Sequence, residues 1–170
     1  MLSRNLLLQI ASAVVIVTAV TAFFLLKPKP EDIHIHAGFV VIENNTKVDF
    51  SGFKYMKLEP CGDEGHQEDE QLEKAHLHDS VGDVVHVHRS NPKWSDLFTN
   101  IEYPLEYSKV KVYFNGQQVE NFQDKIIQPF DSIVILVGEN DVEKALAQAV
   151  TRDHIEEVEK KSENCGASKK

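Results

Sequence analysis

Three pairs of histidines, each with the pattern His-x-His, give this sequence its clearest chemical character. They are His34 and His36, His76 and His78, and His86 and His88. Each pair alternates with apolar residues, and residues i and i+2 of a β-strand share one face. Two imidazoles then point to one side of a strand while aliphatic side chains pack on the other. The pattern predicts a transition-metal site on the face of a β-sheet.

Imidazole nitrogens at this spacing suit zinc or copper. Neighbouring strands lie about 4.8 Å apart and residues i and i+2 about 6.6 Å apart, so three rings from two strands can converge on one ion. Zinc and copper(II) both accept imidazole, and zinc with three protein ligands keeps a position for water. In spacing alone the pattern is similar to the sites of carbonic anhydrase and the cupins. The alternative is that the histidines coat a solvated sheet face.

The segment between the second and third pairs decides which face these histidines occupy. Asp79 begins and Gly82 ends a predicted type I turn, with Gly82 left-handed in a three-residue hairpin loop. This loop pairs Asp79 with Asp83 and His76 with His86, so all four histidines share one face. A register shift of one residue would separate them. Asp79 either hydrogen-bonds the turn backbone or orients a neighbouring histidine as an outer partner.

A second predicted hairpin follows the first histidine pair. Asn44-Asn45 is typical of a two-residue type I′ loop. The resulting register sets Val41 against Val48 and Phe39 against Phe50. Burial of these apolar groups directs His34 and His36 to the opposite face of the sheet.

The remaining patterns predict an α+β fold with an antiparallel or mixed sheet and short flanking helices. The order of these elements along the chain suggests a β-grasp-like topology. Phe53–Tyr55 is predicted as a short strand, and Ser95 as the cap of a helix that presents Trp94 inward. Asn115-Gly116 predicts a hairpin, and the continuous apolar run Ser132–Val137 predicts a central strand buried on both faces.

A C-terminal helix is predicted from a capping box at Asn140 and Glu143, with an apolar stripe that reaches Val150. A second cap at Asp153 predicts a break near Thr151. Earlier in the chain, the acidic segment 59–73 contains His66 and is predicted to be a solvated helix or mobile loop rather than a cation site. His66 and His154 are expected to be isolated surface residues.

Residues 6–26 carry no charge and would form a helix about 31 Å long, enough to cross a bilayer. We expect an uncleaved signal anchor after a short tail (1–5), although a cleaved signal peptide is the alternative. A linker (27–32), the histidine-rich domain (33–162) and a C-terminal tail (163–170) complete the predicted organisation. The positive charges on the two sides of the span are nearly equal in number. The short tail before the span fits a signal anchor with a cytoplasmic N-terminus, so we expect a single-pass membrane protein with an extracytoplasmic domain.

The net charge of the chain limits the classes of molecule that it is expected to bind. The formal net charge is −9, and all 27 acidic residues follow the predicted span. Such a domain attracts cations and is a poor candidate for nucleic acid or an anionic lipid surface. The expected partners are therefore a metal ion and, through the N-terminal helix alone, membrane lipid. The sequence identifies no protein partner.

Two cysteines, Cys61 and Cys165, complete the set of candidate chemical groups. They do not form a Cys-x-x-Cys redox motif. In an oxidising compartment they are expected to form a disulfide, which would close a long loop. Two unrelated thiols, or soft ligands for copper(I), are the alternatives.

The segments 34–37, 75–79 and 82–88, followed by Trp94-Ser-Asp-Leu-Phe98, resemble an uncharacterised family of prokaryotic membrane-anchored, histidine-rich extracytoplasmic proteins. The resemblance covers roughly residues 33–138 and implies a membrane-tethered domain. It supplies no established activity. Some relatives carry a disulfide-isomerase-like label, which the lack of a Cys-x-x-Cys motif here does not support.

Three functions are consistent with these patterns. The leading hypothesis is a membrane-anchored protein that scavenges, delivers or senses zinc or copper. A metal-dependent hydrolase or oxygenase could use the same ligands, with Glu73, Asp79 or Asp83 as the general base. A scaffold domain of the cell envelope, with no role for a metal, is the third.

Overall fold

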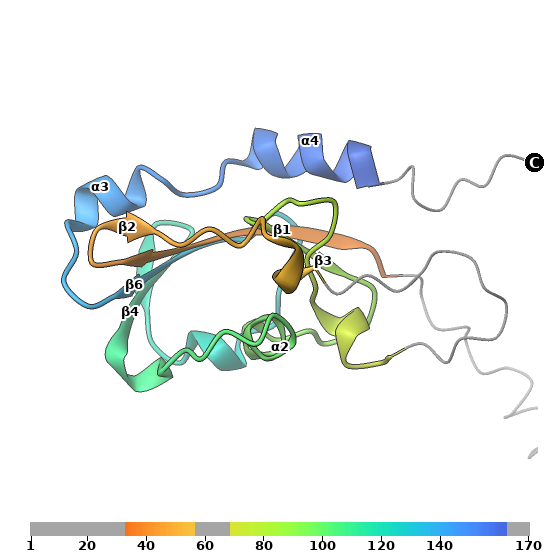
Figure 1. Ribbon diagram of the computed structural model, residues 1–170, viewed down its shortest axis with the longest axis horizontal. Coiled ribbons are helices and arrows are strands. Elements are labelled where there is room, and N and C mark those ends of the chain that lie inside the picture. Colours follow the sequence, from red (N-terminus) through yellow and green to blue (C-terminus); the bar gives the residue numbers. More distant parts are fainter. Residues whose placement is uncertain (1–32, 57–68, 163–170) are drawn as a thin grey trace, which may run out of the picture. The chain divides into compact units, whose positions relative to one another are not determined.

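The computed structural model describes residues 33–56 and 69–162, which form a mixed β-sheet packed between helices (Figure 1). Within these residues the sheet has six strands: β1 (Ile35–Glu43), β2 (Thr46–Lys47), β3 (Val84–Val87), β4 (Val110–Phe114), β5 (Gln117–Val119) and β6 (Ser132–Val137). The α-helices are α2 (Trp94–Asn100), α3 (Val142–Leu146) and α4 (Arg152–Ser162). Four short 3-10 helices are η1 (Phe53–Tyr55), η2 (Leu72–Lys74), η3 (Tyr107–Lys109) and η4 (Phe122–Asp124).

The predicted α+β class is confirmed, and the sheet is mostly antiparallel. Its strand order is β2-β1-β6-β4-β5, and the central pair β1 and β6 is parallel. Strand β3 pairs antiparallel with the first half of β1, whereas β2 pairs with the end of β1. A continuous apolar sequence lets β6 occupy the centre, since its residues Ile133 to Leu136 are buried on both faces.

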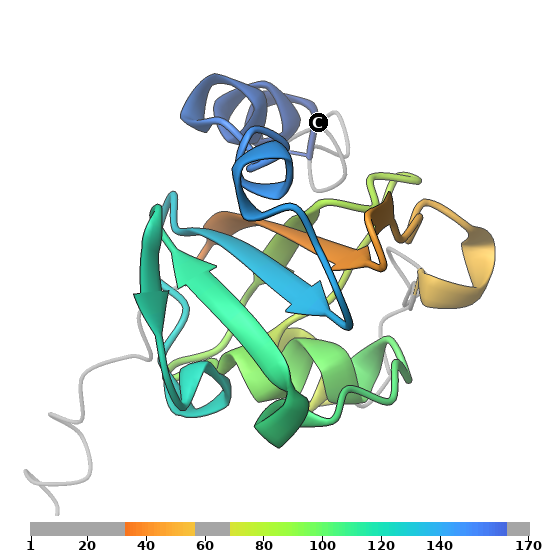
Figure 2. The ribbon, with the colours of Figure 1, turned by 90° about the vertical axis from the view of Figure 1, so that its left-hand side faces the viewer.

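Two apolar cores lie on opposite faces of the sheet. Helix α2 packs on one face with Phe39, Phe50 and Trp94, and α3 and α4 cover the other with Val40 and Ile155. Figure 1 shows α2 on one side of the sheet and the two C-terminal helices on the other, and Figure 2 shows the same layers from one end. The apolar stripe predicted for the C-terminal segment therefore packs on the sheet.

The predicted asparagine turns are confirmed. Asn44 and Asn45 have φ values of 48° and 68°, and the hydrogen bond from Val48 N to Val41 O is 2.9 Å long. Asn115 and Gly116 have φ values of 49° and 82° between β4 and β5. Positive φ at both central residues defines the type I′ turn, which matches the twist of the strands it joins.

Residues Phe53–Tyr55 form the 3-10 helix η1, so the strand predicted there is wrong. Asp49 Oδ1 accepts a hydrogen bond from Ser51 N at 2.8 Å, which turns the chain out of the sheet. Phe53 is 80% exposed, and none of the apolar clusters formed by the described residues includes its ring. Aromatic residues favour strands only where a neighbouring strand and a core receive them.

The loop after His78 keeps the predicted register with different turn chemistry. Asp79 and Ser80 have φ values of 56° and 58°, and Val81 N donates to His78 O at 3.0 Å, so the turn is centred on these two residues. Gly82 does not have a positive φ. It is needed for a different reason: a Cβ there would overlap the Phe50–Ser51 backbone.

The three predicted helix caps are each displaced by one or two residues. Helix α2 begins at Trp94 because Asp96 Oδ2 accepts from Lys93 N at 2.8 Å, and Ser95 lies inside the helix. Asp141 rather than Asn140 caps α3 and accepts from Lys144 N. The break near Thr151 is confirmed. The side chain of Thr151, instead of that of Asp153, accepts a hydrogen bond in the first turn of α4, from His154 N to Thr151 Oγ1 at 3.3 Å.

Candidate metal centre

Strand β3 lies between the other two segments that carry histidine pairs. His86 is opposite His36 of β1 on one side and opposite His76 on the other, as the hairpin register predicted. The His86 amide and carbonyl both bond to His76, at 2.9 and 3.0 Å. His36 and His86 are therefore a non-hydrogen-bonded pair, the kind whose side chains approach more closely.

This pairing gathers all six histidines into one group, which we call the histidine cluster: His34, His36, His76, His78, His86 and His88. The ring of His86 is at its centre. The centroids of the other five rings lie 4.3 to 5.2 Å from that of His86. The hairpin sequence predicted three of these neighbours, His76, His78 and His88, on the face of His86. The pairing of β1 with β3 was not predicted. Identical His-x-His alternation in both segments was the only sequence signal for it.

Burial of the aliphatic residues fixes the face on which the histidines lie. Ala75, Leu77, Val85 and Val87 are fully buried in the core beneath α2, as predicted. The cluster consequently occupies the face that α4 covers. At Gly38 the chain before α4 approaches so closely that a Cβ would overlap Val150. A glycine at that position lets the C-terminal segment pack directly against the sheet beside the histidines.

Helix α4 makes the cluster less accessible than an open sheet face. Glu159 on this helix lies with Oε1 3.8 Å from His36 Nδ1. His36 is 2% exposed and His86 is 6% exposed, although His34 remains exposed. The solvated face considered in the sequence analysis is therefore not what forms here, because the two central rings are removed from water.

Two groups of three histidines have the geometry of a metal site. The first contains His34, His36 and His86, and the second contains His76, His78 and His86. Within each group the candidate ligand nitrogens all lie within 4.8 Å of one another. Nitrogens that bind one ion at about 2.0–2.1 Å are themselves about 3–4 Å apart, so small side-chain rotations suffice to close either group on an ion.

The second group is already oriented for ligation. His76 Nδ1 lies 3.0 Å from Leu72 O, and His78 Nδ1 lies 2.8 Å from Asp79 Oδ2. A carbonyl and a carboxylate only accept hydrogen bonds, so each Nδ1 carries the proton and each Nε2 presents a lone pair. Metal-binding histidines are commonly held in this way by a carboxylate or a carbonyl. Asp79 makes the contact required of an outer partner.

Three of the four nitrogens of the two central rings, His36 and His86, are buried without a hydrogen bond. Among the described residues, four buried side-chain nitrogens lack a hydrogen-bond partner: both of His36, Nε2 of His86, and Nε1 of Trp94. Burial, reinforced by neighbouring imidazoles, lowers the pKa of His36 to about 4 and also lowers the pKa of His86. Burial likewise lowers the pKa of His76 to about 4. These rings are neutral at pH 7, as ligation requires.

Other predicted candidates lie elsewhere. Asp83 bonds to Lys47 Nζ at 3.2 Å and to His154 Nε2 at 3.1 Å, so His154 is not isolated. Cys61 and Cys165, with the predicted disulfide, lie outside the described residues, as do His66 and most of the acidic segment. His88 is not a member of either three-residue group, although it stacks on His34.

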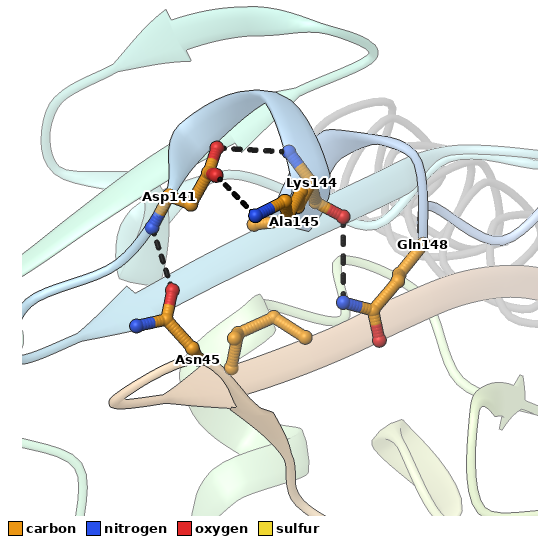
Figure 3. Close-up of a pocket in the computed structure, with 6 residues that line it drawn as sticks. Asn45, Asp141, Lys144, Ala145 and Gln148 are labelled. Atoms are coloured by element: carbon orange, nitrogen blue, oxygen red, sulfur yellow. Dashed lines mark hydrogen bonds and ion pairs between the residues drawn. The ribbon is translucent and has the colours of Figure 1, made fainter.

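A hollow at the other end of β1 offers no comparable chemistry (Figure 3). It is bordered by Asn45 and by residues of α3 and the turn after it. Asn45 Oδ1 accepts from Asp141 N at 2.7 Å, and the Asp141 carboxylate bonds to both Lys144 N and Lys144 Nζ. These polar groups are used to hold α3 against the β1–β2 turn.

Comparisons of the chain with protein-family models, curated proteins and solved structures gave no match. Within residues 33–56 and 69–162, no helix has both the length and the apolar character needed to cross a bilayer. The predicted span at 6–26 lies outside these residues.

Proposed function

We propose that this protein binds a divalent transition metal, zinc or copper, through the histidine cluster, and that it does so as a membrane-anchored extracytoplasmic protein. The observation that carries the proposal is the pair of three-histidine groups around a desolvated core. Burying an imidazole nitrogen without a partner costs free energy, and a bound ion would recover it.

The donor set favours transition metals such as zinc and copper over calcium and magnesium. All the ligands offered by the two groups are imidazoles, which suit zinc and copper, whereas calcium and magnesium require oxygen donors. The negative net charge would raise the local concentration of any cation. The anchor and the outward orientation rest on the uncharged segment 6–26 and on the family resemblance. The parallel central pair β1 and β6 supports a β-grasp-like description of the domain.

Two of the three carboxylates predicted as general bases are engaged by neighbouring side chains, which favours metal binding over metal-dependent hydrolysis. Asp83, one candidate base, is engaged by Lys47 and His154. Asp79, another candidate, is held against His78 Nδ1, where it can orient a ligand. A reaction would need a free base beside an open coordination position. A role in capturing, delivering or sensing the ion requires neither.

The test uses the full-length protein, purified without a polyhistidine tag, stripped with EDTA and dialysed against zinc or copper. Elemental analysis should find at least one ion per chain in the wild type and in the control variant His154→Asn. His76→Asn/His86→Asn should lose the ion. At a free-metal concentration of 100 times Kd, each bound ion should also stabilise the fold by about 2.7 kcal/mol.

A wild-type metal content equal to that of His76→Asn/His86→Asn would contradict the proposal and favour a scaffold role. Near-ultraviolet circular dichroism, which reports on the buried Trp94, shows whether each variant retains the fold. The thermal shift of the wild type on adding metal is independent of any variant.

A further inference from the structure

His86 is the one residue that belongs to both three-histidine groups. The two groups approach it from opposite sides of β3, since β1 supplies His34 and His36 and the segment before the turn supplies His76 and His78. The rings of His36 and His78 both have their centroids 4.3 Å from that of His86. His86 is thus shared evenly between two sets of partners.

The two ring nitrogens of His86 have different surroundings. Its Nδ1 faces Nε2 of His78. Its Nε2 is buried and has no hydrogen-bond partner. The lone pairs of Nδ1 and Nε2 diverge in the plane of the ring, and a metal–nitrogen bond is only about 2.0–2.1 Å long. An ion bound at one nitrogen therefore cannot be the ion bound at the other.

We propose that the histidine cluster holds two transition-metal ions bridged by the imidazole ring of His86. This inference rests on the proposed function and extends it from one ion to a coupled pair. His76 and His78 bind the first ion together with His86 Nδ1, and His34 and His36 bind the second together with His86 Nε2. His88 stacks on one ring of each group, His34 and His76, and so lies at the boundary between the two sites.

The bridge has a defined proton balance. A neutral His86 carries one N–H proton and one lone pair. Binding the second ion displaces that proton into water and leaves an imidazolate with a lone pair for each metal. The charge of the two cations compensates the negative ring, and the buried position of His86 keeps water from competing for either nitrogen.

The test uses copper(II) as the probe in the full-length protein. Elemental analysis should find two ions per chain at saturation. In electron paramagnetic resonance, the first copper should give the signal of one unpaired electron. The second should reduce this signal instead of doubling it, because an imidazolate couples the two spins. These wild-type readings do not depend on whether any variant folds.

Paired variants separate the sites. His34→Asn/His36→Asn and His76→Asn/His78→Asn should each bind one copper and give one uncoupled spin, while His154→Asn should behave as the wild type. In His86→Asn the spin coupling should disappear. Circular dichroism establishes that each variant compared is folded.

Each contrary result has a distinct meaning. A single ion at saturation, lost in both paired variants, would leave metal binding intact and overturn the bridge. Two ions with two independent spins, or coupling that persists in His86→Asn, would overturn it as well. Failure of the wild type to bind any copper or zinc would overturn the proposed function together with the bridge.

Discussion

The polar side chains at the two ends of β1 differ in burial and in hydrogen bonding. At the turn end, Asn45 N donates to Asn140 Oδ1 at 2.7 Å, and Asn140 Nδ2 donates to Val137 O at 2.8 Å. At the histidine end, both nitrogens of His36 and Nε2 of His86 are buried without hydrogen bonds. The same strand therefore begins in an unsatisfied cluster and ends in a satisfied network.

The polar groups at the turn end stabilise the fold, whereas the buried imidazoles at the histidine end serve another purpose. Side chains at the turn end join three segments of backbone, and each hydrogen bond there contributes to stability. The buried imidazoles at the histidine end instead cost stability in the metal-free protein. Unsatisfied buried polar groups are uncommon in native structures and frequently mark a functional or ion-binding site. We expect the two ends to respond oppositely to acid and to substitution.

Acid should produce the largest difference between the ends. The pKa of His76 is about 4 in the fold and about 6.5 in the unfolded chain, so the unfolded state takes up protons first. Stability is complete above about pH 6.5 and is lost as the pH falls toward 4, by roughly 3 kcal/mol for His76 alone. Urea denaturation of EDTA-treated protein between pH 7.5 and 4.5 measures the loss.

The turn end should not contribute to that loss. A hydrogen bond from Lys144 lowers the pKa of Asp141 from 3.8, so its stabilising effect disappears only at lower pH. His36→Leu should make the transition less sensitive to acid. Equal urea midpoints at pH 7.5 and pH 5 would show that burial of the histidine cluster does not lower the pKa values of its imidazoles, and would contradict the prediction.

Substitution by leucine should have opposite signs at the two ends. His36→Leu replaces an unsatisfied imidazole with an apolar group and should stabilise the metal-free protein by about 1–2 kcal/mol. Asn140→Leu removes three side-chain hydrogen bonds and should destabilise it by about 1–3 kcal/mol. Denaturant midpoints at pH 7.5 in EDTA measure both effects. Destabilisation by His36→Leu would mean that His36 supports the fold without metal.

The smallest expected effect concerns the cap of α3. Asp141→Ala removes the acceptor of the bond from Lys144 N and should cost about 1 kcal/mol. Because α3 lies at the turn end, the loss should be the same with and without saturating zinc. Glu143→Ala, elsewhere in the same helix, is the control for a change of charge. A loss that depends on zinc would link the two ends of β1 energetically.

Much of the local structure could be predicted because its causes are local. The Asn-Gly and Asn-Asn pairs specify their turns through positive φ, and the alternation around the histidine pairs specifies which side chains are buried. The cap positions were displaced because several adjacent residues can accept the same amide hydrogen bond. The strand predicted at Phe53–Tyr55 failed because strand propensity depends on a partner and a core.

By itself, the sequence determined the face of the histidines and the pairing of His76 with His86. The buried alternation of Leu77, Val85 and Val87 fixes the face, and the three-residue loop fixes the pairing. Only the tertiary structure decided that β1 lies beside β3, that α4 covers the cluster and that His86 is surrounded by five other imidazoles. These contacts join segments far apart in the chain. Such pairing depends on how two apolar faces are packed against helices, which no short sequence pattern specifies.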